Sequence, residues 1–368
     1  MADRPRNLSN RASALWTVGA TVVVLGTGWL LSNVPEFAGF LVVLPAIAAG
    51  IGTVRQTAWV SIWTAAASAA SIARRPPTTS RENIALVLFA IAFGVFAVWL
   101  CSWRLSRAAQ TARLRSAAIA MQRHLVRALP QVTEEVLLAG VYEPMPEENL
   151  VGGDIYDIME TAYGTRVILA DVEGKGLPAL GAAMAVVGSF REAAHRESTL
   201  TGLVEALEQA VIRQNLYAAE AGEPQRFVTA LILDVDGGPE VQAVNCGHLP
   251  PYVLGPEGVQ ALQLEGLSVP LGLADLVDEP RTVSWFPLGA RETLLLFTDG
   301  LAESRARDGS FFPLEEHLAK LDGAAPAEIP AALWREARAF ANGRQEDDIA
   351  VLALRRNPMA RRGSGEWG

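Results

Sequence analysis

Four aspartates in separate motifs are the residues of this sequence best suited to chemistry. Hard divalent cations such as Mg²⁺ and Mn²⁺ prefer carboxylate oxygens and water as ligands. The sequence has no cluster of His or Cys, and its two cysteines are too far apart for a metal-binding spacing or a disulfide framework. We therefore expect a divalent-cation site built from the motifs Val-Gly-Gly-Asp154, Ala-Asp171-Val-Glu-Gly-Lys-Gly, Phe-Thr-Asp299-Gly and Glu-Asp347-Asp348-Ile.

The length and charge of the chain limit what else it could be. With 368 residues, it is long enough for a membrane region and one complete enzyme domain. Half of its residues are hydrophobic, and the excess is concentrated near the N-terminus. The net charge of −9 does not favour a nucleic-acid-binding surface, so we expect no nucleic-acid partner.

Four charge-free stretches near the N-terminus have the length of membrane spans. At about 1.5 Å per helical residue, each is long enough to match the ~30 Å hydrocarbon core of a bilayer. A buried helical hairpin of a soluble domain is the alternative, but such helices need a polar face. A cleaved signal peptide would need a small-residue cleavage site, and none is convincing. We predict an all-α transmembrane bundle over residues 12–103, formed by the runs Ala12–Pro35, Phe37–Val54, Gln56–Ala73 and Asn83–Trp103.

The basic residues beside these runs predict the orientation in the plasma membrane. Arginines precede the first run, in residues 1–11, and four more follow the fourth run, from Arg104 to Arg115. Because short cytoplasmic flanks are enriched in Lys and Arg, both ends of the bundle are expected in the cytoplasm. Arg74, Arg75 and Arg81 in the loop between runs three and four oppose this orientation. The loops are too short to hold a folded external sensor.

A helical connector is expected to join the membrane region to the rest of the chain. Residues 104–130 are rich in Ala, Leu, Arg and Gln, and Pro130 would end a helix over Arg104–Leu129. A rigid spacer and a signalling helix that also forms a homodimer are both open readings. The apolar pattern is too short to predict a coiled coil.

The remaining chain alternates short β-rich runs with helical stretches, which predicts an α+β domain over residues 131–356. Residues 357–368 are expected to form a disordered tail. The predicted helices are Leu177–His195, Leu200–Ala219 and Ala327–Asn342. The predicted strands are Val136–Tyr142, Arg166–Asp171, Phe227–Asp234, Val241–Asn245, Pro251–Leu254, Glu292–Thr298 and Ile349–Leu354.

Eight motifs in this part of the chain occur in the order of one known family. The segment from about 122 to 355 resembles the PPM/PP2C-type protein phosphatases, and in particular their bacterial SpoIIE/RsbU-like branch. One such motif alone is a weak signal, whereas eight in register are specific. The matching segments are Gln122–Pro130, Val151–Asp157, Ala170–Ala179, Phe227–Ala230, Asn245–Pro251, Pro270–Leu273, Phe297–Leu301 and Glu346–Ile349.

The resemblance implies a β-sandwich flanked by helices, with two Mn²⁺ or Mg²⁺ ions in a cleft. Carried over by motif position, Asp171 would bridge both ions and the backbone carbonyl of Val172 would add an oxygen ligand. Asp154 would serve one ion, directly or through water, while Asp299 and Asp347 would hold the other. Two metals of this kind acidify a water molecule that attacks phosphorus, so no protein nucleophile is required. Asp157 and Asp348 are candidates for support of the ligands.

The resulting functional prediction is a membrane-anchored, metal-dependent phosphatase. Its expected substrate is a regulatory protein phosphorylated on serine or threonine, of the anti-sigma-factor-antagonist type. In this resemblance Glu173 stands where a small serine is usual, so a catalytically weak phosphoprotein-binding module is the alternative. A transporter is disfavoured because the membrane runs contain no charge. Membrane or dimer rearrangement is expected to act through the connector on Asp154 or Asp299.

Overall fold

The computed structural model describes residues 10–30, 38–72, 80–125, 127–144, 153–174, 176–266, 269–278, 280–321, 323–345 and 347–359. Contacts within the chain divide it into two compact units, Met1–Leu114 and Arg115–Gly368. Several positions of interest lie outside the described residues, namely Val151, Gly152, Lys175 and Glu346 of the motifs, most of the N-terminal segment 1–11 and the end of the tail.

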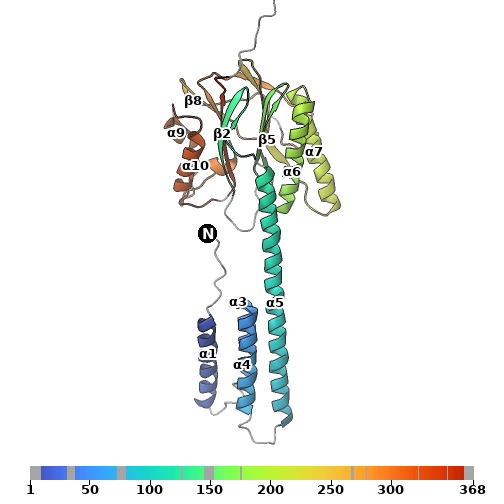
Figure 1. Cartoon of the computed structure of the whole chain (residues 1–368), viewed down its shortest axis with the longest axis vertical. Coiled ribbons are helices and arrows are strands. Elements are labelled where there is room, and N and C mark those ends of the chain that lie inside the picture. Colours follow the sequence, from blue (N-terminus) through green and yellow to red (C-terminus); the bar gives the residue numbers. More distant parts are fainter. Residues whose placement is uncertain are drawn as a thin grey trace, which may run out of the picture. The chain divides into compact units, whose positions relative to one another are not determined.

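The first unit is helical (Figure 1). It contains α1 (Asn10–Leu30), the 3-10 helix η1 (Ala38–Val42), α3 (Val43–Ile51), α4 (Val54–Ile72) and the first part of α5 (Ser80–Leu125). The helices α4 and α5 meet where Ser61 lies against Gly94, and the Ser61 hydroxyl donates to the Gly94 carbonyl at 3.3 Å. A Cβ on Gly94 would lie 2.9 Å from the Ser61 Cβ, so the missing side chain permits this close approach.

Only part of the predicted membrane bundle has a counterpart in these helices. Among the described residues, one helix, Ile84–Arg113, is long and apolar enough to cross a membrane, with a mean hydropathy of 2.8. The second predicted span is not one continuous α-helix, because a 3-10 helix precedes the nine residues of α3 and Gly52 ends them. Leu15–Val24 and Phe40–Ile51 are apolar but shorter than a span. The four-span bundle therefore stays a prediction.

The second unit contains two antiparallel sheets. Within the described residues, the first sheet has the strand order β1-β2-β11-β10-β7-β8 and the second has the order β3-β4-β5-β6-β9. The first comprises β1 (Gln131–Val132), β2 (Val136–Glu143), β11 (Ile349–Arg356), β10 (Thr293–Phe297), β7 (Tyr252–Gly255) and β8 (Gly258–Ala261). The second comprises β3 (Ile155–Thr161), β4 (Gly164–Val172), β5 (Val228–Val235), β6 (Glu240–Cys246) and β9 (Ser284–Pro287).

Helices cover the outer faces of both sheets, so that the unit has four layers. Figure 1 shows α6 (Leu177–Arg196) and α7 (Leu200–Glu220) on one side, with α9 (Leu314–Ala319) and α10 (Ile329–Phe340) on the other. The short helix α8 (Asp299–Ala302) follows β10, and the 3-10 turn η3 (Ala274–Leu276) precedes β9. The chain turns sharply into α7 at Thr199, whose side chain accepts a hydrogen bond from the Gly202 amide as an N-cap.

The alternation of side chains along each central strand explains the layering. In β4, Val167 and Leu169 join the core between the two sheets, whereas Ile168 and Ala170 join the core under α6 and α7. Successive strand side chains point to opposite faces, so a strand covered on both faces is apolar throughout. This packing places the ends of β4, β10 and β11 in a rigid frame.

The predicted elements of this unit are largely confirmed. Every predicted strand coincides with an observed one within two residues at each end, and so does each predicted helix. Four of the described strands were not predicted, namely β1, β3, β8 and β9. The connector helix was predicted to end at Leu129, but α5 ends at Leu125. After the helix, the Arg127 carbonyl accepts a hydrogen bond from the Tyr156 hydroxyl at 2.6 Å, and Pro130 disfavours helical geometry at Leu129.

Candidate functional site

The candidate metal ligands gather from both sheets. Asp154 immediately precedes β3, Asp171 lies near the end of β4, Asp299 begins α8 and Asp347 precedes β11. The pKa of Asp171 is raised to about 7, first by burial and then by the charges of Asp299, Asp347 and Asp348, while a hydrogen bond with Asp154 acts in the opposite direction. The fold therefore brings side chains from four distant motifs into electrostatic contact.

Asp154 is the most deeply buried of the four. Only 2% of the residue is exposed. The pKa of Asp154 is raised well above the usual value, mainly by burial and then by the charges of Asp171 and Asp348. The Thr298 hydroxyl donates to Asp154 Oδ2 at 2.6 Å and itself accepts from the Ala350 amide at 2.9 Å. Thr298, which precedes the predicted ligand Asp299, thus orients Asp154, a role that the sequence did not indicate.

The chemistry of this donor set fits divalent cations. Clustered carboxylates that raise one another's pKa are stabilised when a cation replaces their protons. Within the residues that the structure describes, no group of three or more His, Cys, Asp or Glu side chains already surrounds a single ion position. A site of two ions does not need such a group, because hard cations also take backbone carbonyls and water as ligands.

Two glycines allow the close backbone approaches behind this cluster. A Cβ on Gly300 would lie 1.9 Å from the Asp348 carbonyl oxygen, so α8 and the turn before β11 touch only because residue 300 has no side chain. A Cβ on Gly153 would lie 2.6 Å from the Val172 carbonyl oxygen and 2.8 Å from Asp171 Oδ1. Any larger residue at either position would displace backbone that carries a candidate ligand.

The loop after Asp171 is held by an arginine that sequence reasoning missed. Arg226 Nη1 donates to the Glu173 carbonyl, and the same nitrogen lies 3.9 Å from Glu173 Oε2. The Glu173 amide donates to the Phe227 carbonyl at 3.0 Å. The additional carboxylate of Glu173 is therefore accompanied by a positive charge. No local sequence pattern could identify this partner, because it lies 53 residues away.

Asp157 and Asp348 have different environments. Asp157 is fully buried and accepts from Arg127 Nε at 2.8 Å and from Arg191 Nε at 2.5 Å. It ties the segment after α5 and the helix α6 to β3, the strand that follows Asp154. Asp348, in contrast, raises the pKa of both Asp154 and Asp171 and so lies within the acidic cluster.

His248 and Cys246 have pKa values that disfavour a role as nucleophiles. Burial lowers the pKa of His248 to about 4, so the ring is neutral at pH 7. Its Nε2 lies 3.2 Å from the Phe297 carbonyl, which can only accept, so Nδ1 accepts from the Thr229 hydroxyl. Burial raises the pKa of the Cys246 thiol to about 12, which disfavours the thiolate. Neither side chain is poised as a nucleophile.

The raised pKa of Asp171 predicts how cation binding depends on pH. Binding of Mn²⁺ to the full-length protein is expected to weaken below pH 7, by a factor that approaches about tenfold for each pH unit, because the cation must displace a proton from Asp171. Isothermal titration at pH 6, 7 and 8 measures this slope. An affinity that does not change over this range would contradict a role for Asp171 as a ligand.

The same shift fixes the pH dependence of the metal-free protein. The pKa of Asp171 is higher in the folded state than the ordinary value of 3.8 that applies when unfolded. The folded state then binds more protons, so the free energy of unfolding should fall as the pH rises from about 4 to about 7. Urea titrations in the presence of a chelator measure this fall, and saturating Mn²⁺ should oppose it.

Comparison with known proteins gives one family and several solved structures. The profile of the family described as Stage II sporulation protein E (SpoIIE) matches residues 161–357, more than half of the chain. The SiaA-PP2C domain of Pseudomonas aeruginosa is 20% identical and has a TM-score of 0.55, covering 68% of this chain and 98% of that domain. No curated protein sequence matches the chain.

In two further solved structures, the match covers only part of the other chain. The PP2C phosphatase domain and regulatory fragment of SpoIIE from Bacillus subtilis are 18% identical, with a TM-score of 0.50, covering 60% of this chain and 63% of that one. The RsbU and RsbW domains of a Mycobacterium tuberculosis protein are 21% identical, with a TM-score of 0.46, covering 63% and 62%. The chain thus spans less than two thirds of these two relatives. The likenesses to the SiaA and SpoIIE domains confirm the predicted PP2C-like α+β fold.

Proposed function

Because the chain belongs to the SpoIIE family, we propose that its C-terminal unit is a metal-dependent protein serine/threonine phosphatase. The observation that carries the proposal is the group of aspartates from four separate motifs, in which the charges of the others raise the pKa of Asp154 and of Asp171. A phosphatase fold without such a charge cluster would fit a binding module equally well. The mutual repulsion of these carboxylates destabilises the metal-free fold, and bound cations would offset it.

The proposed ligands come from both sheets. Asp171 would bridge two Mn²⁺ or Mg²⁺ ions, with the Val172 carbonyl and Asp154 beside it. Asp299 and Asp347 would bind from the opposite sheet. When bound, the ions supply Lewis-acid chemistry that lowers the pKa of water and offsets the charge of phosphoryl oxygens.

The protein's own contribution is to hold these ligands still. Thr298 orients Asp154 by a hydrogen bond, and Arg226 holds the loop that carries the Val172 carbonyl by binding the next carbonyl along the chain. Preorganised ligands of this kind spare the reorganisation that the reaction would otherwise require.

The proposed substrate is a regulatory protein phosphorylated on serine, of the anti-sigma-factor-antagonist type that the family resemblance implies. A decisive test incubates the full-length protein with p-nitrophenyl phosphate and with phosphoserine and phosphothreonine peptides, with Mn²⁺, with Mg²⁺ and with a chelator. We expect metal-dependent release of phosphate from all of them. If no substrate is hydrolysed but phosphopeptides still bind, the chain is a phosphoprotein-binding module.

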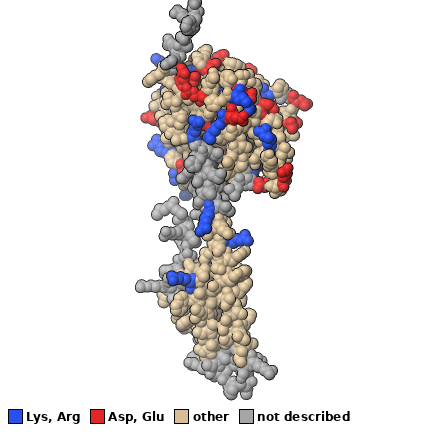
Figure 2. Space-filling model, turned by 45° about the vertical axis from the view of Figure 1, so that its right-hand side comes forward, with Lys and Arg blue, Asp and Glu red and all other residues tan. Residues whose placement is uncertain are grey.

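The helical unit is proposed to anchor this enzyme in the plasma membrane, with the catalytic domain in the cytoplasm. Exposed apolar side chains support the proposal, among them Trp59, Ile62, Leu88, Phe89 and Trp99. In Figure 2 the described surface of this unit is almost free of charged residues, apart from a few near one end. A soluble surface rarely exposes so large an apolar area. Fractionation of cells, followed by alkaline carbonate extraction, tests the anchoring.

Regulation is proposed to pass through the end of α5. Arg127, which follows this helix, binds Asp157 and accepts from Tyr156, and both partners belong to the strand that begins next to Asp154. A shift or dimerisation of the connector could thereby alter the position of Asp154. Equal Mn²⁺ affinity of the protein in bilayers and in detergent, together with a monomeric state in both, would count against it.

A further inference from the structure

A cavity beside the candidate metal ligands contains two arginines that the proposed mechanism does not use. It has a volume of about 240 Å³, and its lining includes Asp299, Glu303, Ser304, Arg305, Arg344 and Asp347. Two of these residues are candidate ligands for the cations. Arg305 and Arg344 are both exposed residues.

One wall of the cavity is a tightly anchored turn. After α10, the chain passes through two residues with positive φ, Asn342 (55°) and Gly343 (76°). The Gly343 amide donates to the Arg338 carbonyl at 2.8 Å, and the Asn342 amide donates to the Ala339 carbonyl at 3.1 Å. This is the hydrogen-bond pattern of a helix ended by left-handed residues. It fixes where the Arg344 side chain leaves the backbone.

In the same wall, the side chain of Gln345 links the turn to β2 and to Asp347. Gln345 Nε2 donates to the Glu143 carbonyl at 2.9 Å and to the Asp347 carbonyl at 2.8 Å. These bonds fasten the turn to the edge of β2 and to its own next residues. Gln345, the neighbour of Arg344, is thus hydrogen-bonded to the backbone of the candidate metal ligand Asp347.

Arg305, also in the lining, is positioned by contacts with Phe311. Its guanidinium lies over the ring of Phe311, 4.5 Å from the centroid, and residues 305 and 311 also form a β-bridge. The Ser304 hydroxyl donates to the Gly300 carbonyl at 2.7 Å, which ties this segment to α8. An arginine stacked on an aromatic ring loses little freedom on binding a ligand, and its edge nitrogens remain available as donors.

We propose that Arg344 and Arg305 form the phosphoryl-binding subsite of the phosphoprotein substrate. Guanidinium groups bind phosphoryl oxygens by paired, charge-assisted hydrogen bonds. The cavity joins these donors to Asp299 and Asp347, so one bound phosphoserine side chain would meet both the cations and the arginines. The carboxylates of the lining would repel a phosphate in the absence of metal, so the subsite operates with the cations bound. It rests on the proposed phosphatase function.

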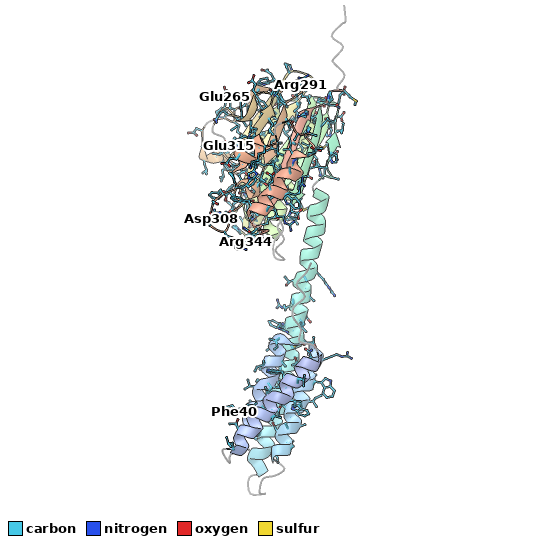
Figure 3. All side chains as sticks on the ribbon, turned by 90° about the vertical axis from the view of Figure 1, so that its left-hand side faces the viewer. Phe40, Glu265, Arg291, Asp308, Glu315 and Arg344 are labelled. Carbon is cyan, nitrogen blue, oxygen red and sulfur yellow. The ribbon has the colours of Figure 1, made fainter. Side chains whose placement is uncertain are left out.

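The test compares Arg344→Gln and Arg305→Gln with Arg291→Gln in the full-length protein. Arg291 is exposed, and its substitution removes the same charge as the other two. Figure 3 shows it at the end of the C-terminal unit opposite to Arg344. Two quantities are measured with Mn²⁺: the steady-state constants for a phosphoserine peptide, and equilibrium binding of the same peptide with a non-hydrolysable phosphonate. Titration with Mn²⁺ alone checks that the cation site is intact.

Arg344→Gln should raise both KM and the Kd of the phosphonate peptide about tenfold, the usual effect of losing one charge-assisted hydrogen bond. Arg305→Gln should change both constants in the same direction. In both variants, kcat and the affinity for Mn²⁺ should stay within about twofold of the wild-type values. All of these constants should stay within about twofold in Arg291→Gln. Inorganic phosphate should also inhibit the Arg344→Gln protein less. Unchanged KM and Kd in both arginine variants would overturn the subsite. If the wild-type protein hydrolyses nothing, the proposed function fails, while the phosphonate titrations still decide whether the arginines bind phosphate.

Discussion

Replacing Asp171 with asparagine is expected to lower the Mn²⁺-dependent rate of phosphate ester hydrolysis by on the order of 10³-fold. Asparagine keeps the size of the side chain but removes the charge that would bridge two cations. A metal ion contributes several kcal/mol of charge stabilisation to such a reaction, and each 1.36 kcal/mol is a factor of about ten in rate. The measurement is kcat/KM for p-nitrophenyl phosphate, together with the number of Mn²⁺ ions bound.

The fold should survive this substitution. In the metal-free protein, Asp171 raises the pKa of Asp154, so removing its charge relieves repulsion between buried carboxylates. The Asp171→Asn protein is therefore expected to unfold at an equal or higher urea concentration than the wild type at pH 8 in chelator. Asp275→Asn, at an exposed position in η3, is the matched control and should leave activity unchanged. Retention of full activity by Asp171→Asn would refute the proposed mechanism.

Replacing Asp234 with alanine is expected to reduce the free energy of unfolding by about 3–5 kcal/mol. Asp234 Oδ2 accepts from Arg166 Nε at 3.0 Å, and the Arg166 side chain is fully buried. Removing one partner of a buried ion pair leaves an uncompensated charge, which is far more costly than the pair itself is stabilising. Arg166 also donates to the carbonyls of Ala194 and Glu197 at 2.9 and 2.6 Å, so the loss would disturb the end of α6.

Two further variants separate the cost of leaving the Arg166 charge buried and unpaired from the cost of removing any carboxylate side chain. Asp236→Ala removes a carboxylate from an exposed position two residues along the chain and should cost no more than about 1 kcal/mol. The double variant Arg166→Met with Asp234→Leu should recover most of the loss, because a buried ion pair can often be replaced by apolar residues. Urea denaturation of the three proteins gives the comparison. A loss below about 1 kcal/mol for Asp234→Ala would show that water reaches Arg166.

Much of the fold could be predicted from local patterns. Apolar, β-branched runs between turn residues predict the strands of the second unit. The observed ends of β2, β5, β10 and β11 lie within two residues of the predicted ends. The strand β3 was not predicted because Ile155–Thr161 contains Asp157 and Glu160, which are not typical of strands. Asp157 is tolerated in a buried strand only because Arg127 and Arg191 accompany it.

By itself, the sequence determined the ligand chemistry and the order of the motifs. Carboxylates in four separate motifs, with no His or Cys cluster, indicate a hard cation wherever they meet. Only the tertiary structure decided how they meet: that Asp348 lies within the cluster, that Thr298 orients Asp154, that Arg226 accompanies Glu173, and that Arg305 and Arg344 share a cavity with Asp299 and Asp347. These relations join residues far apart in the chain, and the packing of two sheets creates them. Local propensity carries no information about such contacts, whereas it suffices for the strands that make them possible.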